Sequence, residues 1–71
     1  MGPPAEEVAL AAELSALRAD EHEAYRKYEQ LSDQAYSIGR PDIAAELQSI
    51  AEDEHRHSTM LDSMLNTLRW Y

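Results

Sequence analysis

The sequence predicts an all-α protein, an antiparallel hairpin of two long helices that pairs with a second copy to form a four-helix bundle. Apolar residues recur at alternating steps of four and three along two long segments, and one short stretch between them carries helix-breaking residues. The length of 71 residues suits one domain, residues 1–71, which is too short to bury much apolar surface alone. Because the chain has no cysteine, we expect oligomerisation or a bound metal to add stability.

The first helix is expected over about residues 5–38. Pro3 and Pro4 precede it, and Glu6 and Glu7 suit the positive end of its dipole. Its heptad row consists of Leu10, Leu14, Leu17, Glu21, Ala24, Tyr28, Leu31, Ala35 and Ile38. These positions share one face of a helix, which we expect to pack against a partner.

The turn is expected at residues 39–41 and the second helix over about residues 42–69. Gly39 fits the left-handed position that ends a helix, and Pro41 suits the first turn of the next one. The second heptad row consists of Ile43, Leu47, Ile50, Glu54, His57, Leu61, Met64 and Leu68. A turn this short makes the helices antiparallel neighbours. Trp70 and Tyr71 are expected either to cover the end of the bundle or to anchor a larger assembly.

The chain is acidic, with 14 acidic and 6 basic residues and a net charge of −8. This balance argues against binding to nucleic acid or to anionic membranes and favours cations. The start of the chain lacks the features of a signal peptide, and no segment approaches the roughly 20 apolar residues of a membrane span. We therefore expect a cytoplasmic protein.

Three polar residues interrupt the heptad rows: Glu21 in the first, and Glu54 and His57 in the second. A buried carboxylate needs a counter-charge or a proton. Folding the hairpin about residues 40–41 brings the three to one patch, and a glutamate facing Glu-x-x-His is the ligand pattern of two-metal sites in helix bundles. Two chains supply four glutamates, whose charge two divalent ions would neutralise. The alternative is a polar layer in which glutamate and histidine pair without metal.

Other polar and sulfur-containing residues lie off this pattern or are interpreted as packing residues. Glu52 and His55 form a second Glu-x-x-His, which we expect to be solvated, with an accessory surface metal site as the alternative. His22 is also off the row and is expected at the surface. Met60 and Met64 are interpreted as side chains that fill gaps in the packing rather than as ligands.

Over about residues 16–61 the chain resembles the ferritin-like superfamily. It is most similar to the iron-binding hairpin of rubrerythrins and to half-ferritins, or encapsulated ferritins, which carry one such hairpin per chain. The matching residues are Glu21, Tyr28, Gly39, Ile43-Ala44 and Glu54-His55-Arg56-His57. The chain differs from full rubrerythrins in lacking the rubredoxin-like Cys-x-x-Cys motif, and its end shows no encapsulin-targeting peptide.

The resemblance implies roles for particular residues. Glu21 would be the ligand from the first helix, Glu54 would bridge the metals and His57 would bind one of them. Tyr28 would hydrogen-bond a ligand or supply an electron. Asp20 and Glu23 flank Glu21, where encapsulated ferritins carry acidic residues that guide iron inward.

The resemblance also implies a reaction and partners. Carboxylate and imidazole donors suit Fe, Mn or Zn, and the family points to iron, two ions per dimer. The expected enzyme is a ferroxidase that oxidises Fe²⁺ with O₂ or peroxide for storage or detoxification, with catalysis by Glu21, Glu54, His57 and Tyr28. Expected partners are a second chain, a ring of dimers and an encapsulin shell. The alternatives are a peroxide reductase like rubrerythrin, a helical dimerisation module without enzymatic activity, and a metal-binding or sensing protein.

Overall fold

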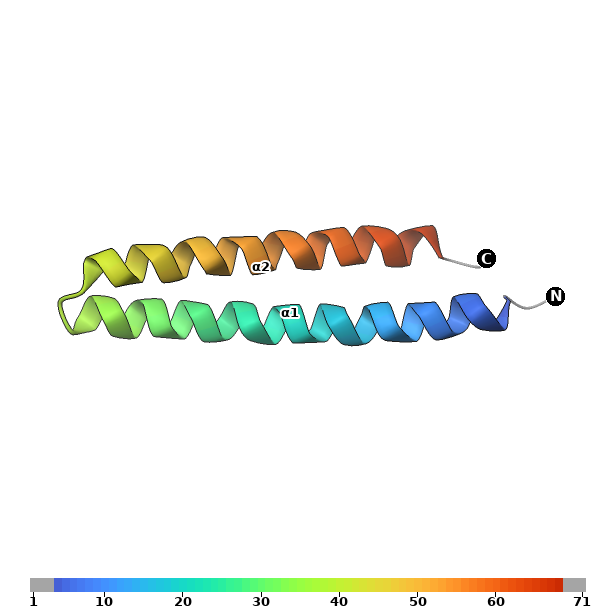
Figure 1. The fold of residues 1–71 in the computed structure, drawn as a ribbon, viewed down its shortest axis with the longest axis horizontal. Coiled ribbons are helices and arrows are strands. Elements are labelled where there is room, and N and C mark those ends of the chain that lie inside the picture. The colour runs from blue at the N-terminus through green and yellow to red at the C-terminus, as the bar shows by residue number, and fades with distance from the viewer. Residues whose placement is uncertain (1–3, 69–71) are drawn as a thin grey trace.

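Two helices make up nearly all of the computed structural model, which describes residues 4–68 (Figure 1). α1 spans Ala5–Ser37 and α2 spans Pro41–Thr67, close to the ranges expected from the sequence. The helices lie side by side and antiparallel, and the described residues contain no strand. The all-α hairpin is thus confirmed, whereas its pairing with a second copy stays a prediction. Trp70 and Tyr71 lie outside the described residues.

Neither of the two described helices combines the length and the apolar character that crossing a membrane requires.

The turn between the helices is fixed by Gly39, whose φ of 81° places it in the left-handed region. The amide of Gly39 donates to the Tyr36 carbonyl at 3.1 Å and the amide of Arg40 donates to the Ala35 carbonyl at 2.9 Å. These two bonds form the Schellman motif, which satisfies carbonyls at the end of α1. Pro41 then opens α2, where its missing amide hydrogen costs nothing. The conformation expected of Gly39 is confirmed.

Small side chains fill the interface between the helices. The buried residues are Ser32, Ala35, Ala44, Ala51 and Ser58. Three of them, Ala44, Ala51 and Ser58, recur every seven residues along α2, so they lie on the same side of that helix. Side chains of this size allow two helix backbones to approach closely. The hydroxyl of Ser32 also bridges the helices, because it donates to the Ala44 carbonyl at 2.8 Å.

The large apolar residues of the heptad rows divide between two faces of the hairpin. Leu14, Leu47 and Leu61 are partly buried towards the other helix. Six others are exposed by 40% or more and form what we call the apolar face: Leu10, Leu17, Ile38, Ile43, Ile50 and Met64. The two heptad rows are therefore not buried as one interface. Because the helices contact each other closely through alanine and serine, the residues of the apolar face point to the side of the hairpin.

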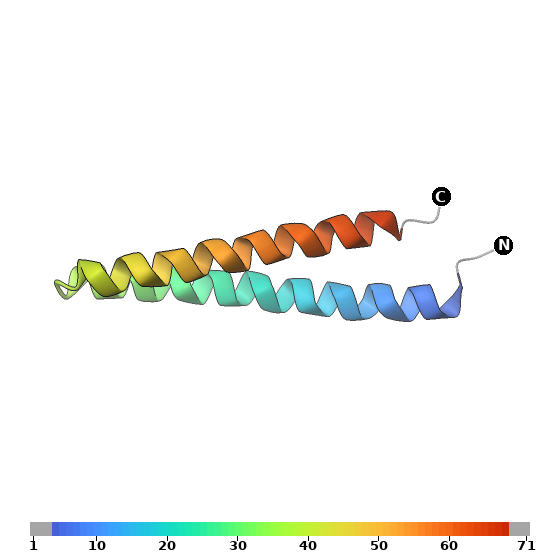
Figure 2. The ribbon, with the colours of Figure 1, turned by 45° about the horizontal axis from the view of Figure 1, so that its top comes forward.

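The packing also changes along the hairpin. The fully buried positions begin near the turn, whereas nearer the chain ends the interface holds partly buried leucines such as Leu14 and Leu65. The gap between the two ribbons is correspondingly wider where α1 begins and α2 ends than at the turn (Figures 1 and 2). The helices are thus closest where their side chains are smallest.

Two buried serines should respond to substitution in opposite ways. Ser32→Ala should lower the free energy of unfolding by about 1 kcal/mol, because it removes the hydrogen bond between the helices. Ser58→Ala should leave it unchanged or raise it by up to about 1 kcal/mol, because the Ser58 hydroxyl has no hydrogen-bond partner within the described chain. Urea unfolding at one protein concentration measures both. Equal losses in the two variants would contradict this account of the interface.

Candidate metal centre

Glu21, Glu54 and His57 form a cluster in which each residue offers one ligand atom within 4.8 Å of the others. We call it the carboxylate–histidine cluster. Glu21 comes from α1, and Glu54 and His57 come from α2. Their separation of three residues puts Glu54 and His57 next to each other on one side of the helix. The sequence expectation that these three residues share one patch agrees with this geometry.

One oxygen of Glu21 lacks the partner that a buried carboxylate needs. Its Oε2 atom is buried and accepts no hydrogen bond within the described chain. The Nδ1 atom of His57 lies 3.5 Å from it, which is too long for a good hydrogen bond. A buried acceptor left in this state is costly. A cation placed among the three side chains would satisfy it.

The two carboxylates also influence each other's charge. Glu21 raises the pKa of Glu54, chiefly because a hydrogen bond between the carboxyl groups needs a proton on Glu54. Burial and the negative charge of Glu21 raise the pKa further, and His57 acts in the opposite direction. Without metal, the cluster therefore favours a proton at Glu54. A bound cation would take the place of that proton.

The donor set fits a transition metal with oxygen and nitrogen ligands. Two carboxylates and one imidazole suit Fe, Mn or Zn, and the chain offers no thiolate. The side chain of His57 is 47% exposed and that of Glu21 is 26% exposed, so the cluster is open on one side. One chain thus provides three donors and leaves room for further ligands from outside.

Tyr28 lies on α1 seven residues after Glu21 and is partly buried. Its hydroxyl has no hydrogen bond within the described residues, so its role beside a ligand stays a prediction.

Tyr25, in contrast, makes two side-chain contacts. Its hydroxyl donates to Glu29 Oε2 at 3.0 Å, and its ring centroid lies 5.5 Å from that of His55. The hydrogen bond to Glu29 is the main cause that raises the pKa of Tyr25.

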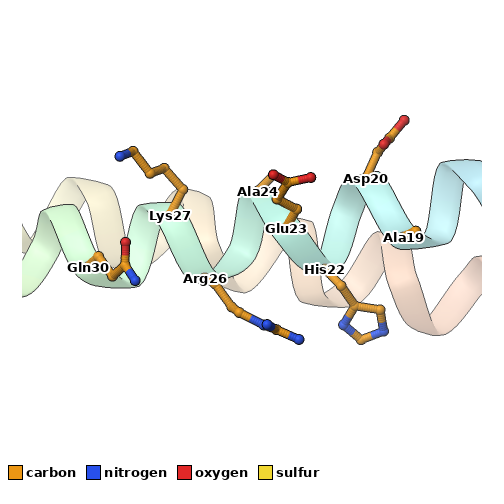
Figure 3. A pocket seen from close by; sticks show the side chains of 8 residues that line it. All are labelled: Ala19, Asp20, His22, Glu23, Ala24, Arg26, Lys27 and Gln30. Carbon is orange, nitrogen blue, oxygen red and sulfur yellow. The ribbon is translucent and has the colours of Figure 1, made fainter.

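Asp20 and Glu23 do not join the cluster. Both are exposed and line a wide, shallow depression on α1, together with Ala19, His22, Ala24, Arg26, Lys27 and Gln30 (Figure 3). Asp20, Glu23 and Lys27 point to one side of α1, while His22 and Arg26 point to the other (Figure 3). A role of the two acidic residues in guiding iron stays a prediction.

The second Glu-x-x-His pair lies apart from the cluster. Glu52 and His55 are exposed, and His55 contacts Tyr25.

The sequence alone did not predict the ion pair between Arg18 Nη1 and Asp62 Oδ1, which are 2.8 Å apart. This ion pair joins the helices on the side of the cluster nearer the chain ends, and pairing the levels of the two helices would have found it. Because both side chains are 41–48% exposed, it contributes on the order of 1 kcal/mol or less.

The chain was compared with known proteins. The sequence model of the Rubrerythrin family matches residues 9–71, a stretch that includes almost all of α1, all of α2 and the three residues of the cluster. No curated protein and no solved structure matches the chain. The family match confirms the resemblance seen in the sequence.

The metal-free protein should be stabilised by Glu54→Gln. The folded chain holds the Glu54 proton more tightly than the unfolded chain does, because the pKa is raised on folding. The free energy of unfolding therefore falls as pH rises from the ordinary glutamate pKa through the raised one, and the neutral amide avoids this loss. Thermal unfolding at pH 7 in a chelator should show a higher midpoint for the variant, and the difference should vanish in acid.

The matched control is Glu52→Gln, which removes the same charge from an exposed position on the same helix. This variant should change the midpoint little. A lower midpoint for metal-free Glu54→Gln at pH 7 would contradict the account of the cluster.

Proposed function

The chain belongs to the rubrerythrin family, a di-iron family of the ferritin-like superfamily, and we propose that it is a ferroxidase whose site is shared between two copies. The observation that carries this proposal is the carboxylate–histidine cluster, in which a buried oxygen of Glu21 has no hydrogen-bond partner within the described residues. A cluster of two acids and one imidazole is costly without a cation and suited to iron with one.

The proposal of two copies follows from the open side of the cluster. His57 lies in the same heptad register as Ile43, Ile50 and Met64, which belong to the apolar face. A two-fold axis that buries this face against its own copy would bring two clusters together. The four glutamates would then carry a charge of −4, which two divalent ions would balance. Two chains also supply the four glutamates and two histidines of the two-metal pattern in helix bundles.

Fe²⁺ is the substrate in this proposal. Two Fe²⁺ ions each lose one electron, and one O₂ molecule takes up both electrons and two protons to give H₂O₂, or one H₂O₂ molecule takes them up to give two water molecules. Glu21 and Glu54 favour the product because carboxylates are hard anionic donors that stabilise Fe³⁺. The proton on Glu54 leaves when the metal binds. The oxidised iron then passes to storage or detoxification, in or outside an encapsulin shell.

Peroxide reduction is the second candidate, because the chain belongs to the rubrerythrin family and its resemblance to rubrerythrins implies that activity as the alternative to ferroxidation. In that case the same two ions would cycle as a cofactor, and a separate reductant would supply the electrons. Oxygen consumption on addition of Fe²⁺ supports the ferroxidase. Sustained peroxide turnover with a reductant, and slow oxygen consumption, would support the peroxide reductase. No stoichiometric metal in the purified protein would support the dimerisation module.

Substitution of the cluster should abolish the reaction. Glu54→Ala and His57→Ala should each lower the initial rate of Fe²⁺ oxidation by about 100-fold or more, since each removes a direct ligand. The rate is followed by the absorbance of Fe³⁺ and by an oxygen electrode. The controls Glu52→Ala and His55→Ala lie outside the cluster and should stay within about twofold of the original protein. Equal losses in both pairs would contradict the assignment of the cluster.

Metal should also tighten the dimer. Sedimentation equilibrium with Fe²⁺ under nitrogen should give a lower dissociation constant than sedimentation in a chelator, because metal relieves repulsion among four glutamates. Ile50→Glu on the apolar face should weaken the dimer in both conditions, whereas Gln48→Glu at an exposed position of α2 should not. An identical dissociation constant with and without metal would count against a shared site.

A further inference from the structure

A small cavity adjoins the carboxylate–histidine cluster and extends it towards apolar and sulfur-containing side chains. It has a volume of about 200 Å³ and is open to solvent. Its lining residues are Leu17, Glu21, His57, Met60, Leu61 and Met64. Four of the six are apolar, and two of these carry thioether sulfur. The cavity thus combines one imidazole with two methionines at the edge of the cluster.

The three side chains with nitrogen or sulfur donors lie along one side of α2. Met60 is three residues after His57, and Met64 is four residues after Met60. Residues at these separations are neighbours on a helix surface, with about 5–6 Å between Cβ atoms. Methionine has three rotatable side-chain bonds, so each sulfur can adapt its position. His57 and Met60 are therefore neighbours, as are Met60 and Met64, and all three side chains line the cavity.

Both methionines are accessible to solvent within one chain. Met60 is 52% exposed and Met64 is 44% exposed, whereas side chains that fill gaps in a core are covered. Other exposed positions of the apolar face hold leucine or isoleucine, which contribute apolar surface without a metal donor. Both methionines of the described chain are instead on the cavity that holds His57.

Thioether and imidazole donors select a particular class of metal. Thioether sulfur is a soft ligand that suits Cu(I), and imidazole suits copper as well. Fe²⁺, a borderline ion that becomes hard on oxidation to Fe³⁺, has carboxylate ligands in the neighbouring cluster. The carboxylate of Glu21 also lines the cavity and provides the negative charge that a monovalent cation needs.

We propose that His57, Met60 and Met64 form a binding site for a soft monovalent metal ion, Cu(I) in the cell. The site goes beyond the proposed iron chemistry. It shares the ligand His57 with the carboxylate–histidine cluster and lies beside Glu21, whereas Glu54 does not line the cavity. His57 has two ring nitrogens, of which Nδ1 is the one near Glu21. His57 is therefore a ligand in both sites, and binding of Cu(I) alters the carboxylate–histidine cluster.

The test uses Ag(I), which is stable in air and has the same preference for soft donors. Isothermal titration of the metal-free full chain with silver nitrate should show one Ag(I) bound per chain. Met60→Leu combined with Met64→Leu should weaken binding by at least about tenfold, the order of loss that follows removal of a metal-binding contact. Leucine keeps the apolar volume, so circular dichroism and sedimentation should be unchanged.

Two further measurements decide where the ion binds. The chain has three methionines, so labelling with ¹³C-methyl methionine gives three signals, and those of Met60 and Met64 should shift with Ag(I) while that of Met1 should not. Glu54→Gln should retain Ag(I) binding although it impairs the iron cluster, which separates the failure of one site from that of the other. Unchanged affinity in the double variant, a shift confined to Met1, loss of Ag(I) binding in Glu54→Gln, or no binding at all would overturn the proposal.

Discussion

Two carboxylates held together beside a helix interface are the constraint on which the rest of this molecule depends. Glu21 and Glu54 each offer an oxygen within 4.8 Å of the other and of His57. A carboxylate this close to another disfavours the charged form of its neighbour. The pKa of Glu54 is raised, chiefly by its hydrogen bond with Glu21, and the Oε2 atom of Glu21 has no hydrogen-bond partner within the described residues. A cation placed among the three side chains would satisfy this oxygen, so the cluster is a candidate site for metal.

The hairpin surrounding this cluster has little core of its own. No large side chain of the described residues is fully buried, and the buried positions hold only alanine and serine. Contacts of this kind bring helices close but bury little apolar area, so they contribute modest hydrophobic stabilisation. The six large side chains of the apolar face remain exposed instead. The apolar face is the surface that the proposed pairing of two copies would bury.

The sequence predicted the helices, the turn and the cluster because each depends on local chemistry. Gly39 and Pro41 have few roles other than ending and starting a helix, and Glu21 stands out because it interrupts an apolar row. The division of that row between two faces could not be predicted in the same way. Ile50 and Ala51 are neighbours in sequence, and a heptad pattern alone does not decide which of them faces the other helix. The recurrence of Ala44, Ala51 and Ser58 was the available signal, but alanine is also common in helices for its propensity.

The change in packing along the hairpin has a consequence for the order in which the chain becomes structured. The Ser32–Ala44 contact near the turn closes a loop of only 12 residues, whereas the Arg18–Asp62 contact spans 44. Short loops lose less entropy on closure, so the helices should pair first near the turn. The end where α1 begins and α2 ends should be the first to open. The acids and the histidine lie between these two regions. An ion bound there would link the two helices between these regions. Metal binding and ordering of the helical turns near the chain ends would then be one coupled equilibrium.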